Sequence, residues 1–171
     1  MGYTFALAQG DTERQDARNF AVRLNGAGFC PPDAPPGILI TSIDSFRPID
    51  IKWIVARDDS GTMVGVLGEV IHPFEGVHNL NLVGAIEPDA QTDELALGLI
   101  SSVVDLIEYG GCCGEQWPWV AVLFENSDML PKILEVYEPY GPVTQEPTGG
   151  PGSGLVKLSG MLNPAGLTSG D

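Results

Sequence analysis

The sequence predicts an α/β (α+β) fold with a mixed, mostly antiparallel central sheet flanked by helices. Apolar residues make up 43% of the 171 residues, which suits a domain with a buried core and not a disordered chain. Segments with strand-like alternation are interleaved with segments of helical periodicity, and three alternating segments follow one another across short turns. We expect residues 1–162 to form a single domain and residues 163–171 to form a C-terminal tail.

The first two expected elements are a strand and a helix. Residues 3–8 are rich in strand-forming side chains and alternate in part. Residues 12–15 have the spacing of a capping box, in which Thr12 and Gln15 satisfy each other's backbone donors at a helix start. Asn25-Gly26 supplies a stop signal. Between these signals the apolar residues recur at helical spacing: Ala17, Phe20, Ala21 and Leu24.

The middle of the chain predicts an irregular segment followed by a meander. Residues 30–37 contain four prolines and cannot form regular structure, and residues 38–43 form either a short strand or an irregular element. Turn residues at 58–61 and at 73–76 separate three alternating segments. We therefore expect three consecutive antiparallel strands, over residues 49–56, 62–71 and 78–86.

A helix and a buried strand are expected next. Apolar residues recur at helical spacing over residues 92–109, and Gly110-Gly111 stops the pattern. In residues 117–124 the side chains that would point to either face of a strand are apolar. This is typical of a central strand that is covered on both faces.

The last expected elements are a short helix and a hairpin. Asp128 is placed to cap the helix, and Pro131 falls in its first turn, where a missing N–H costs little. One further strand begins at Val143, and residues 155–162 form the last strand, hairpinned back across a segment rich in glycine and proline.

Two motifs within this order of elements resemble segments of the GNAT acyltransferases. Residues 86–96 are similar to the family's cofactor segment, in which an apolar residue ends a strand and a proline precedes Gln/Arg-x-x-Gly-x-Gly/Ala at a helix start. Residues 137–142, Tyr-Glu-Pro-Tyr-Gly-Pro, resemble its Tyr-Glu-Lys-x-Gly-Phe motif. The resemblance implies a GNAT-like fold and acetyl-CoA as the cofactor, with these binding residues: Ile86, Gln91, Glu94, Ala96 and Asn126.

The cofactor segment also departs from the family pattern in a way that predicts a disabled site. Glu94 stands where the first glycine belongs, and Asp93 precedes it. Both carboxylates can accept hydrogen bonds from the free N–H groups of the helix start and interact with the positive end of its dipole. These are the features that would otherwise hold a diphosphate. Between Arg57 and Lys132 the sequence has thirteen acidic residues and neither lysine nor arginine. We therefore expect no bound cofactor, unless Arg57, Lys132 or Lys157 folds over the site from elsewhere.

For catalysis, the resemblance implies Tyr137 as the general acid that protonates the leaving thiolate. It implies Glu87 or Glu69 as a base that acts through water on an acceptor amine. The spacing of Tyr137 with Leu130 and Leu134 favours a second interpretation, a core aromatic on the apolar face of its helix. The two glutamates also fit ordinary surface charges. The sequence shows neither a Ser/His/Asp nor a Cys/His arrangement.

The cysteines and histidines do not predict a metal site. The three cysteines are Cys30 and the adjacent pair Cys112-Cys113, a count and placement that fit neither a disulfide framework nor a zinc knuckle. His72 and His78 have no partner ligand at metal spacing. We expect reduced thiols and structural histidines.

The charge of the chain limits its partners. Eight basic and 23 acidic residues give a net charge of −15, which repels nucleic acid and anionic membranes and attracts basic partners. No stretch approaches the roughly 20 apolar residues of a membrane span, and the N-terminus has no secretory pattern. We therefore expect neither direct nucleic acid binding nor membrane insertion, in a protein of the cytoplasm or, if phage-encoded, of the virion.

Three functions remain open on the sequence. The first, which we favour, is a GNAT-like structural or protein-interaction module with a disabled acyl-CoA site. Degenerate domains of this family occur as phage virion components. Such a module would bind a protein partner or its own copies through its acidic face or edge strands, with residues 143–162 as the expected pairing segment. The second is an N-acetyltransferase acting on a basic small molecule or protein amine. The third is an acidic DNA-mimic inhibitor.

Overall fold

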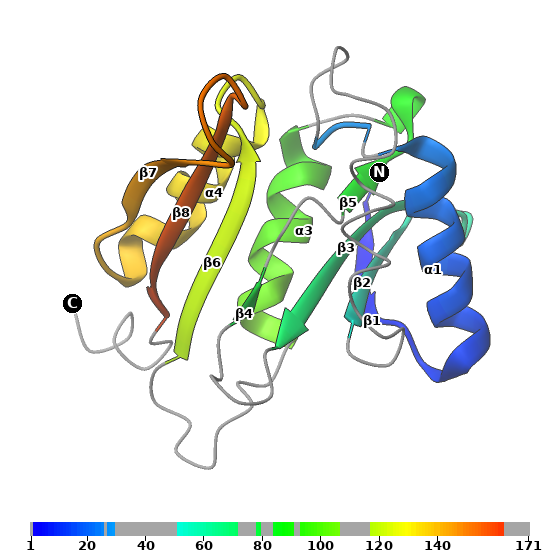
Figure 1. Ribbon diagram of the computed structural model, residues 1–171. Helices are drawn as coiled ribbons and strands as arrows, with labels where there is room; N and C mark the ends of the chain where they lie inside the picture. Colours follow the sequence, from blue (N-terminus) through cyan, green and yellow to red (C-terminus); the bar gives the residue numbers. More distant parts are fainter. Residues whose placement is uncertain are drawn as a thin grey trace.

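The computed structural model describes residues 2–25, 27–29, 51–71, 78–79, 84–90, 93–106 and 117–162, and these form one eight-stranded sheet with helices on both faces (Figure 1). The strand order is β1-β2-β3-β4-β6-β8-β7, and β5 pairs with β3. The predicted fold class is therefore confirmed. Several expectations lie outside the described residues: the irregular segment 30–43, the turn 73–76, the helix end at 107–111 and the tail 163–171.

The N-terminal half of the sheet is an antiparallel meander. Strand β1 (Thr4–Leu7) pairs with β2 (Ile51–Arg57), which pairs with β3 (Met63–Ile71). The predicted third strand is described as two segments, β4 (His78–Asn79) and β5 (Gly84–Ile86), and both pair with β3. The residues between β4 and β5 lie outside the described part.

The predicted turn between β2 and β3 is confirmed, and its geometry follows from one carboxylate. Asp58 Oδ1 accepts hydrogen bonds from Ser60 N (2.9 Å), Ser60 Oγ (2.6 Å) and Thr62 N (3.0 Å). The Ser60 hydroxyl is the largest cause of the lowered pKa of Asp58, because these bonds favour the charged carboxylate.

Helix α1 (Gly10–Leu24) begins earlier than the sequence predicts. Gln9 is the residue that precedes the first turn, and its backbone N–H donates to Glu13 Oε2 at 3.2 Å. The predicted capping box of Thr12 and Gln15 is therefore wrong, since both residues lie within the helix. The helix ends as predicted at Asn25, which adopts the left-handed conformation (φ 48°).

Helices α3 (Asp93–Leu106) and α4 (Met129–Tyr137) cover the opposite face of the sheet from α1, with short 3₁₀ turns at Pro88–Ala90 and Glu138–Tyr140. Asp128 precedes the first turn of α4, but its side chain makes no capping hydrogen bond. The Ser127 hydroxyl accepts instead from Met129 N at 3.2 Å, so the predicted cap is displaced by one residue.

The C-terminal half of the sheet contains β6 (Trp117–Phe124), β7 (Thr144–Thr148) and β8 (Leu155–Leu162), and the predicted bounds of β6 and β8 are confirmed. Strand β6 lies between β4 and β8, as a central strand should. The expectation that both its faces are covered is wrong for the described side chains. Trp119, Ala121 and Leu123 are buried against the helices, whereas Val120 and Val122 at the alternate positions are half-buried, and of this second set only Phe124 at the strand end is buried.

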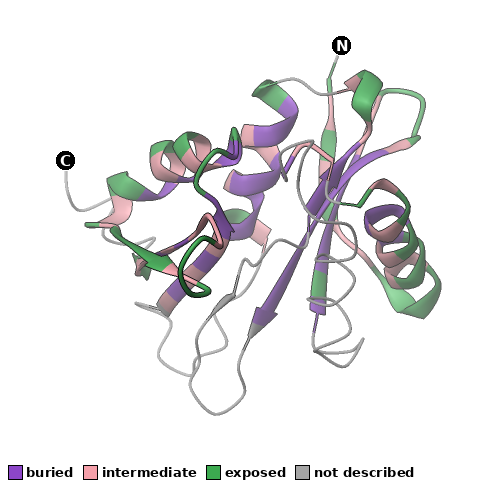
Figure 2. Ribbon diagram, turned by 45° about the horizontal axis from the view of Figure 1, so that its top comes forward, coloured by how far each residue is buried: buried purple, intermediate pink, exposed green. Residues whose placement is uncertain are grey.

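The two faces of the sheet pack two separate hydrophobic clusters. Figure 2 shows buried residues along the central strands and on parts of the helices. One lies beneath α1 and includes Phe20, Trp53 and Val66. The larger one joins α3, α4 and the strands and includes Leu99, Trp119 and Tyr137. No helix in the described ranges is long and apolar enough to span a membrane.

Candidate functional site: the β5–β6 gap

The two halves of the sheet diverge between β5 and β6. Strand β4 runs parallel to β6 and pairs with it at two positions, His78 with Trp119 and Asn79 with Val120. Beyond these, β5 pairs with β3, and in the described part of the chain it has no pairing with β6. Figure 1 shows β6 leaning away from β3 and β5 with α3 behind them. We call this separation the β5–β6 gap.

A short segment that follows α1 crosses this gap on the side of β5. We call Ala27–Phe29 the crossing segment. The backbone N–H of Ile86, the last residue of β5, donates to the carbonyl oxygen of Ala27 at 2.7 Å. The Phe29 ring lies so close to Gly84 that a Cβ built there would be 2.7 Å from its Cε2 and Cζ atoms. The crossing segment therefore occupies a backbone donor and the surface of β5 at the gap.

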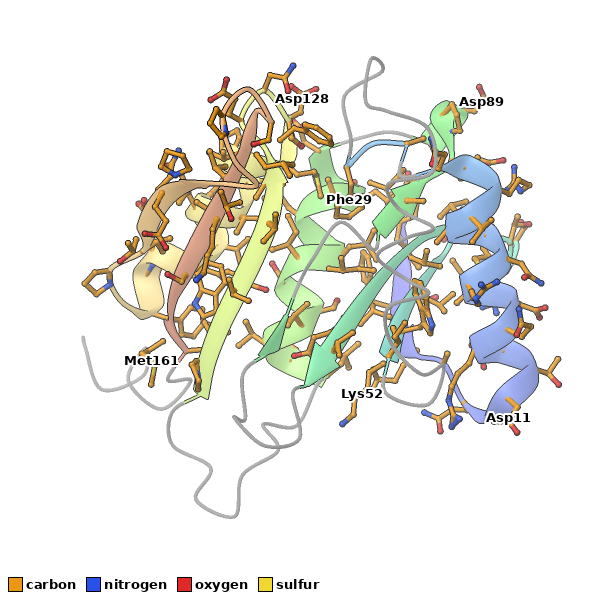
Figure 3. All side chains as sticks on the ribbon, in the orientation of Figure 1. Asp11, Phe29, Lys52, Asp89, Asp128 and Met161 are labelled. Atoms are coloured by element: carbon orange, nitrogen blue, oxygen red, sulfur yellow. The ribbon has the colours of Figure 1, made fainter. Side chains whose placement is uncertain are left out.

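The far end of the crossing segment is bonded to the residue that follows β6 and its turn. Ser127 Oγ donates to the carbonyl oxygen of Phe29 at 2.6 Å, and this bond is buried. The Phe29 side chain itself is buried, in the larger cluster, and Figure 3 places it between β5 and α3. The crossing segment thus joins β5 to the start of α4.

The start of α3 borders the gap and is negative, as the sequence predicts. Asp93 and Glu94 form its first residues and are exposed. Lys132 is one of the three cations that the sequence allowed to fold over the site, and it does approach this helix start: its Nζ on α4 is 3.2 Å from Asp93 Oδ1. At the end of β5, Glu87 forms a second ion pair with Arg23 at 3.1 Å. Lys132 and Arg23, the two cations described beside these carboxylates, are therefore already paired within the chain.

The residues predicted for catalysis are divided between the interior and the surface. Tyr137 is buried, its ring meets that of Trp119 edge-on at 4.5 Å, and its hydroxyl lies 3.5 Å from the carbonyl oxygen of Ile100. Burial raises the pKa of Tyr137 well above its ordinary value, and the charge of Glu69 raises it further. Glu69 is itself fully buried on β3, so these two lie in one region of the core. Glu87 lies apart from them, in its ion pair with Arg23.

The residues predicted for cofactor binding are also divided. Ile86 and Ala96 are buried in the larger cluster, whereas Glu94 and Asn126 are exposed. Gln91 lies outside the described residues. Within the described ranges, no group of histidine, cysteine or acidic side chains is arranged to hold a metal ion.

Sequence reasoning did not identify Phe29 or Ser127 as site residues, and it named Lys132 only as one of three cations that could fold over the site. Phe29 directly precedes the proline-rich segment, and no local pattern marks it. Ser127 could have been found, because serine is a preferred residue immediately before a helix. Its contact with Phe29 carries no sequence signal, since 98 positions separate the two residues.

No family model matches the sequence, and no curated protein matches it. Solved structures do match over nearly the whole chain. Spermidine N-acetyltransferase from Vibrio cholerae, in complex with CoA and spermine, superposes with a TM-score of 0.55 at 13% identity, covering 97% of this chain and 98% of that one. The ribosomal-protein-S18-alanine N-acetyltransferase from Escherichia coli gives a TM-score of 0.57 at 12% identity, with coverage of 95% and 94%.

A putative phosphinothricin N-acetyltransferase gives a TM-score of 0.53 at 10% identity, covering 95% of this chain and 98% of that one. These are acetyltransferases of the GNAT superfamily, and the similarity extends through the helices and strands on both sides of the β5–β6 gap. At these identities the likeness concerns the fold. The chain therefore has the GNAT fold.

Proposed function

We propose that this chain is a GNAT-fold binding module that does not use acyl-CoA and that acts by contacting another protein. The observation that carries the proposal is the crossing segment. It bonds to Ile86 N at one end and to Ser127 Oγ at the other, and its aromatic side chain is buried beside the gap. A ligand entering between β5 and β6 would have to displace all three contacts.

The charges at the start of α3 support the same proposal. A helix N-terminus binds anions through its free N–H groups and its dipole. Asp93 and Glu94 already place two carboxylates there, and Lys132 is engaged by Asp93. A diphosphate would meet like charge on the helix and would compete with a carboxylate for the cation. The role of a protein-binding module suits either the cytoplasm or a virion.

Calorimetric titration with acetyl-CoA and with CoA tests the proposal. We expect no saturable heat at ligand concentrations up to 1 mM (a Kd above about 1 mM is weaker than about −4 kcal/mol) and no concentration-dependent rise of the melting temperature. Saturable binding in the micromolar range by the unmodified chain would overturn the proposal.

Two variants separate the two proposed obstacles to CoA binding, the negative charge at the start of α3 and the crossing segment beside β5. Glu94→Gly removes the carboxylate that stands at the glycine position and should allow weak CoA binding if charge is the main obstacle. Phe29→Ala removes the ring beside Gly84 and should allow binding if occupation is the main obstacle. Asp16→Gly, which changes an exposed acidic residue of α1 remote from the gap, is the control for a general effect of lost charge and added glycine. If the double variant Glu94→Gly/Phe29→Ala stays folded and still does not bind, we have misplaced the obstruction.

One observation favours a second function, an N-acetyltransferase that acts on a basic small molecule or protein amine. Lys132 lies on α4, and its Nζ is near the start of α3, where a cation could contact a phosphate if Asp93 released it. Incubation with acetyl-CoA and spermidine, followed by mass spectrometry, tests this function directly, because transfer adds one acetyl group to an amine of the acceptor. Acetylated product formed at enzyme-like rates would favour this second function over the first.

A further inference from the structure

The described part of the sheet has two edges, and they differ in how well they are protected from pairing with another chain. Strand β1 forms one edge and β7 the other. Unprotected edges expose backbone N–H and C=O groups on which a further strand can form. The sequence-based expectation placed such pairing at residues 143–162, which contain β7. The structure favours the other edge.

The register of β1 shows which of its backbone groups face outward. Ala8 N donates to Trp53 O at 2.8 Å, so this residue pair is hydrogen-bonded. Hydrogen-bonded and non-hydrogen-bonded pairs alternate along an antiparallel ladder. Ala6, paired with Val55, therefore faces β2, whereas the N–H and C=O groups of Phe5 and Leu7 point away from the sheet.

Part of this edge is already satisfied by the chain. The Gln9 side-chain amide donates to Leu7 O at 3.3 Å. For the N–H and C=O of Phe5 and the N–H of Leu7, the described residues provide no outward partner. Within the part of the chain that the structure describes, three aligned backbone groups of β1 therefore face outward without a partner.

The β7 edge carries two protective features that β1 lacks. Pro147 has no N–H to donate, and proline is tolerated in a sheet where that position faces solvent. Glu146 is exposed and forms an ion pair with Lys157 at 3.8 Å. Strand β1 reads Thr-Phe-Ala-Leu and has neither charge nor proline. By these criteria β1 is the edge suited to strand addition.

The surface beside β1 indicates what kind of strand would be accepted. The Phe5 ring lies against Gly98 of α3, leaving no space for a Cβ there. Glu94 lies one turn before Gly98 and Asp105 two turns after it, so both share the helix face that borders β1. Both are exposed, and α3 contains no lysine or arginine.

We infer that β1 is a docking edge for an extended basic segment of a partner protein, which adds as a strand through Phe5 and Leu7. In an added strand, the residues opposite Phe5 and Leu7 point to the same face as those side chains, toward Glu94 and Asp105. Lysine or arginine at alternate positions would therefore meet the two carboxylates. The strong negative charge of the chain, −15, favours the encounter. This inference rests on the proposed function, because it assumes that the chain acts by binding another protein.

The test uses a probe peptide, acetyl-Val-Lys-Val-Lys-Val-Lys-Val-amide, and amide hydrogen exchange measured by NMR. We expect the Phe5 and Leu7 amides to exchange at least about tenfold more slowly with the peptide bound. The Ala6 amide already donates within the sheet and should change little. Binding without protection of Phe5 and Leu7 would overturn the inference, and so would the absence of binding at millimolar peptide.

Two controls separate strand addition from simple charge attraction. The same peptide with N-methylated lysines keeps its charge but loses the N–H groups that face β1, and should bind at least about tenfold more weakly. The variant Glu94→Gln/Asp105→Asn should bind the probe several-fold more weakly, whereas Glu135→Gln/Glu138→Gln, which alters exposed acids of the α4 region, should not. Equal binding of both peptides would show that charge alone is responsible.

The peptide experiment and the CoA titration fail independently. Strand addition at β1 without CoA binding supports both proposals. CoA binding together with strand addition would remove the closed-site proposal and leave β1 as a docking edge. Failure of the probe alone would leave the closed β5–β6 gap in place and remove β1 as its interaction surface.

Discussion

Ser127 and Phe29 are 98 positions apart, and the hydroxyl of Ser127 donates a 2.6 Å hydrogen bond to the carbonyl oxygen of Phe29. The same hydroxyl accepts from Met129 N at 3.2 Å. One buried side chain therefore satisfies a donor at the start of α4 and an acceptor in the crossing segment. The conformation of residues 27–29 is in this way coupled to the start of the helix that carries Tyr137.

Replacing Ser127 by alanine should destabilise the protein by about 1–3 kcal/mol, because a buried carbonyl and a helix N–H both lose their partner. Urea unfolding measures the loss. The neighbouring variant Asp128→Ala should cost less than about 0.5 kcal/mol, since the Asp128 side chain makes no capping bond. If Asp128→Ala proved the more damaging of the two, the cap would be wrongly assigned.

Replacing Gly84 by alanine should destabilise the protein by about 1–3 kcal/mol, because the new Cβ would overlap the Phe29 ring. The change Phe29→Leu shortens the side chain at that point, so the double variant should be more stable than the sum of the two single losses predicts. Thermal unfolding of the four proteins measures this coupling. Gly2→Ala, where the built Cβ has only an ordinary contact at 3.8 Å, is the control.

Removing the Tyr137 hydroxyl should change how stability falls at alkaline pH. The folded state keeps this phenol neutral, because burial and Glu69 raise its pKa, whereas the unfolded chain ionises near pH 10. The contribution of the Tyr137 phenol to the free energy of unfolding is therefore fully present below pH 10. Above pH 10 it is lost at up to about 1.4 kcal/mol per pH unit. Tyr137→Phe should show a shallower decline between pH 10 and 11 in urea unfolding. Between pH 7 and 9 the two proteins should have parallel curves, and identical declines above pH 10 would contradict the assignment.

The ion pair between Lys132 and Asp93 should contribute little to stability, although it defines the charge at the start of α3. Asp93 is 87% exposed, so solvent and salt screen the pair. Lys132→Met should cost less than about 1 kcal/mol, and a double-mutant cycle with Asp93→Asn should show coupling that decreases between 20 and 500 mM NaCl. Coupling that is large and insensitive to salt would mean that the pair is more buried than this arrangement shows.

Local patterns in the sequence predicted the elements, and distant contacts determined the site. Residues 117–124 and 155–162 form strands with the predicted bounds because apolar runs between turn residues are a local signal. The start of α1 was misplaced because Glu13, four residues from Gln9, competes with the capping box of Thr12 and Gln15. The approach of Lys132 to Asp93 and of Phe29 to Gly84 depends on how α4 and the crossing segment pack, which no local pattern encodes.

Two residue pairs, His78 with Trp119 and Asn79 with Val120, provide all the described backbone pairing between the two halves of the sheet. Two further described contacts join the halves: the packing of α3, whose buried face contributes Leu99 and Val103 to the cluster shared by both, and the buried bond from Ser127 to Phe29. Because β6, β7 and β8 pair with one another along most of their length, loss of the α3 packing should release them as one unit.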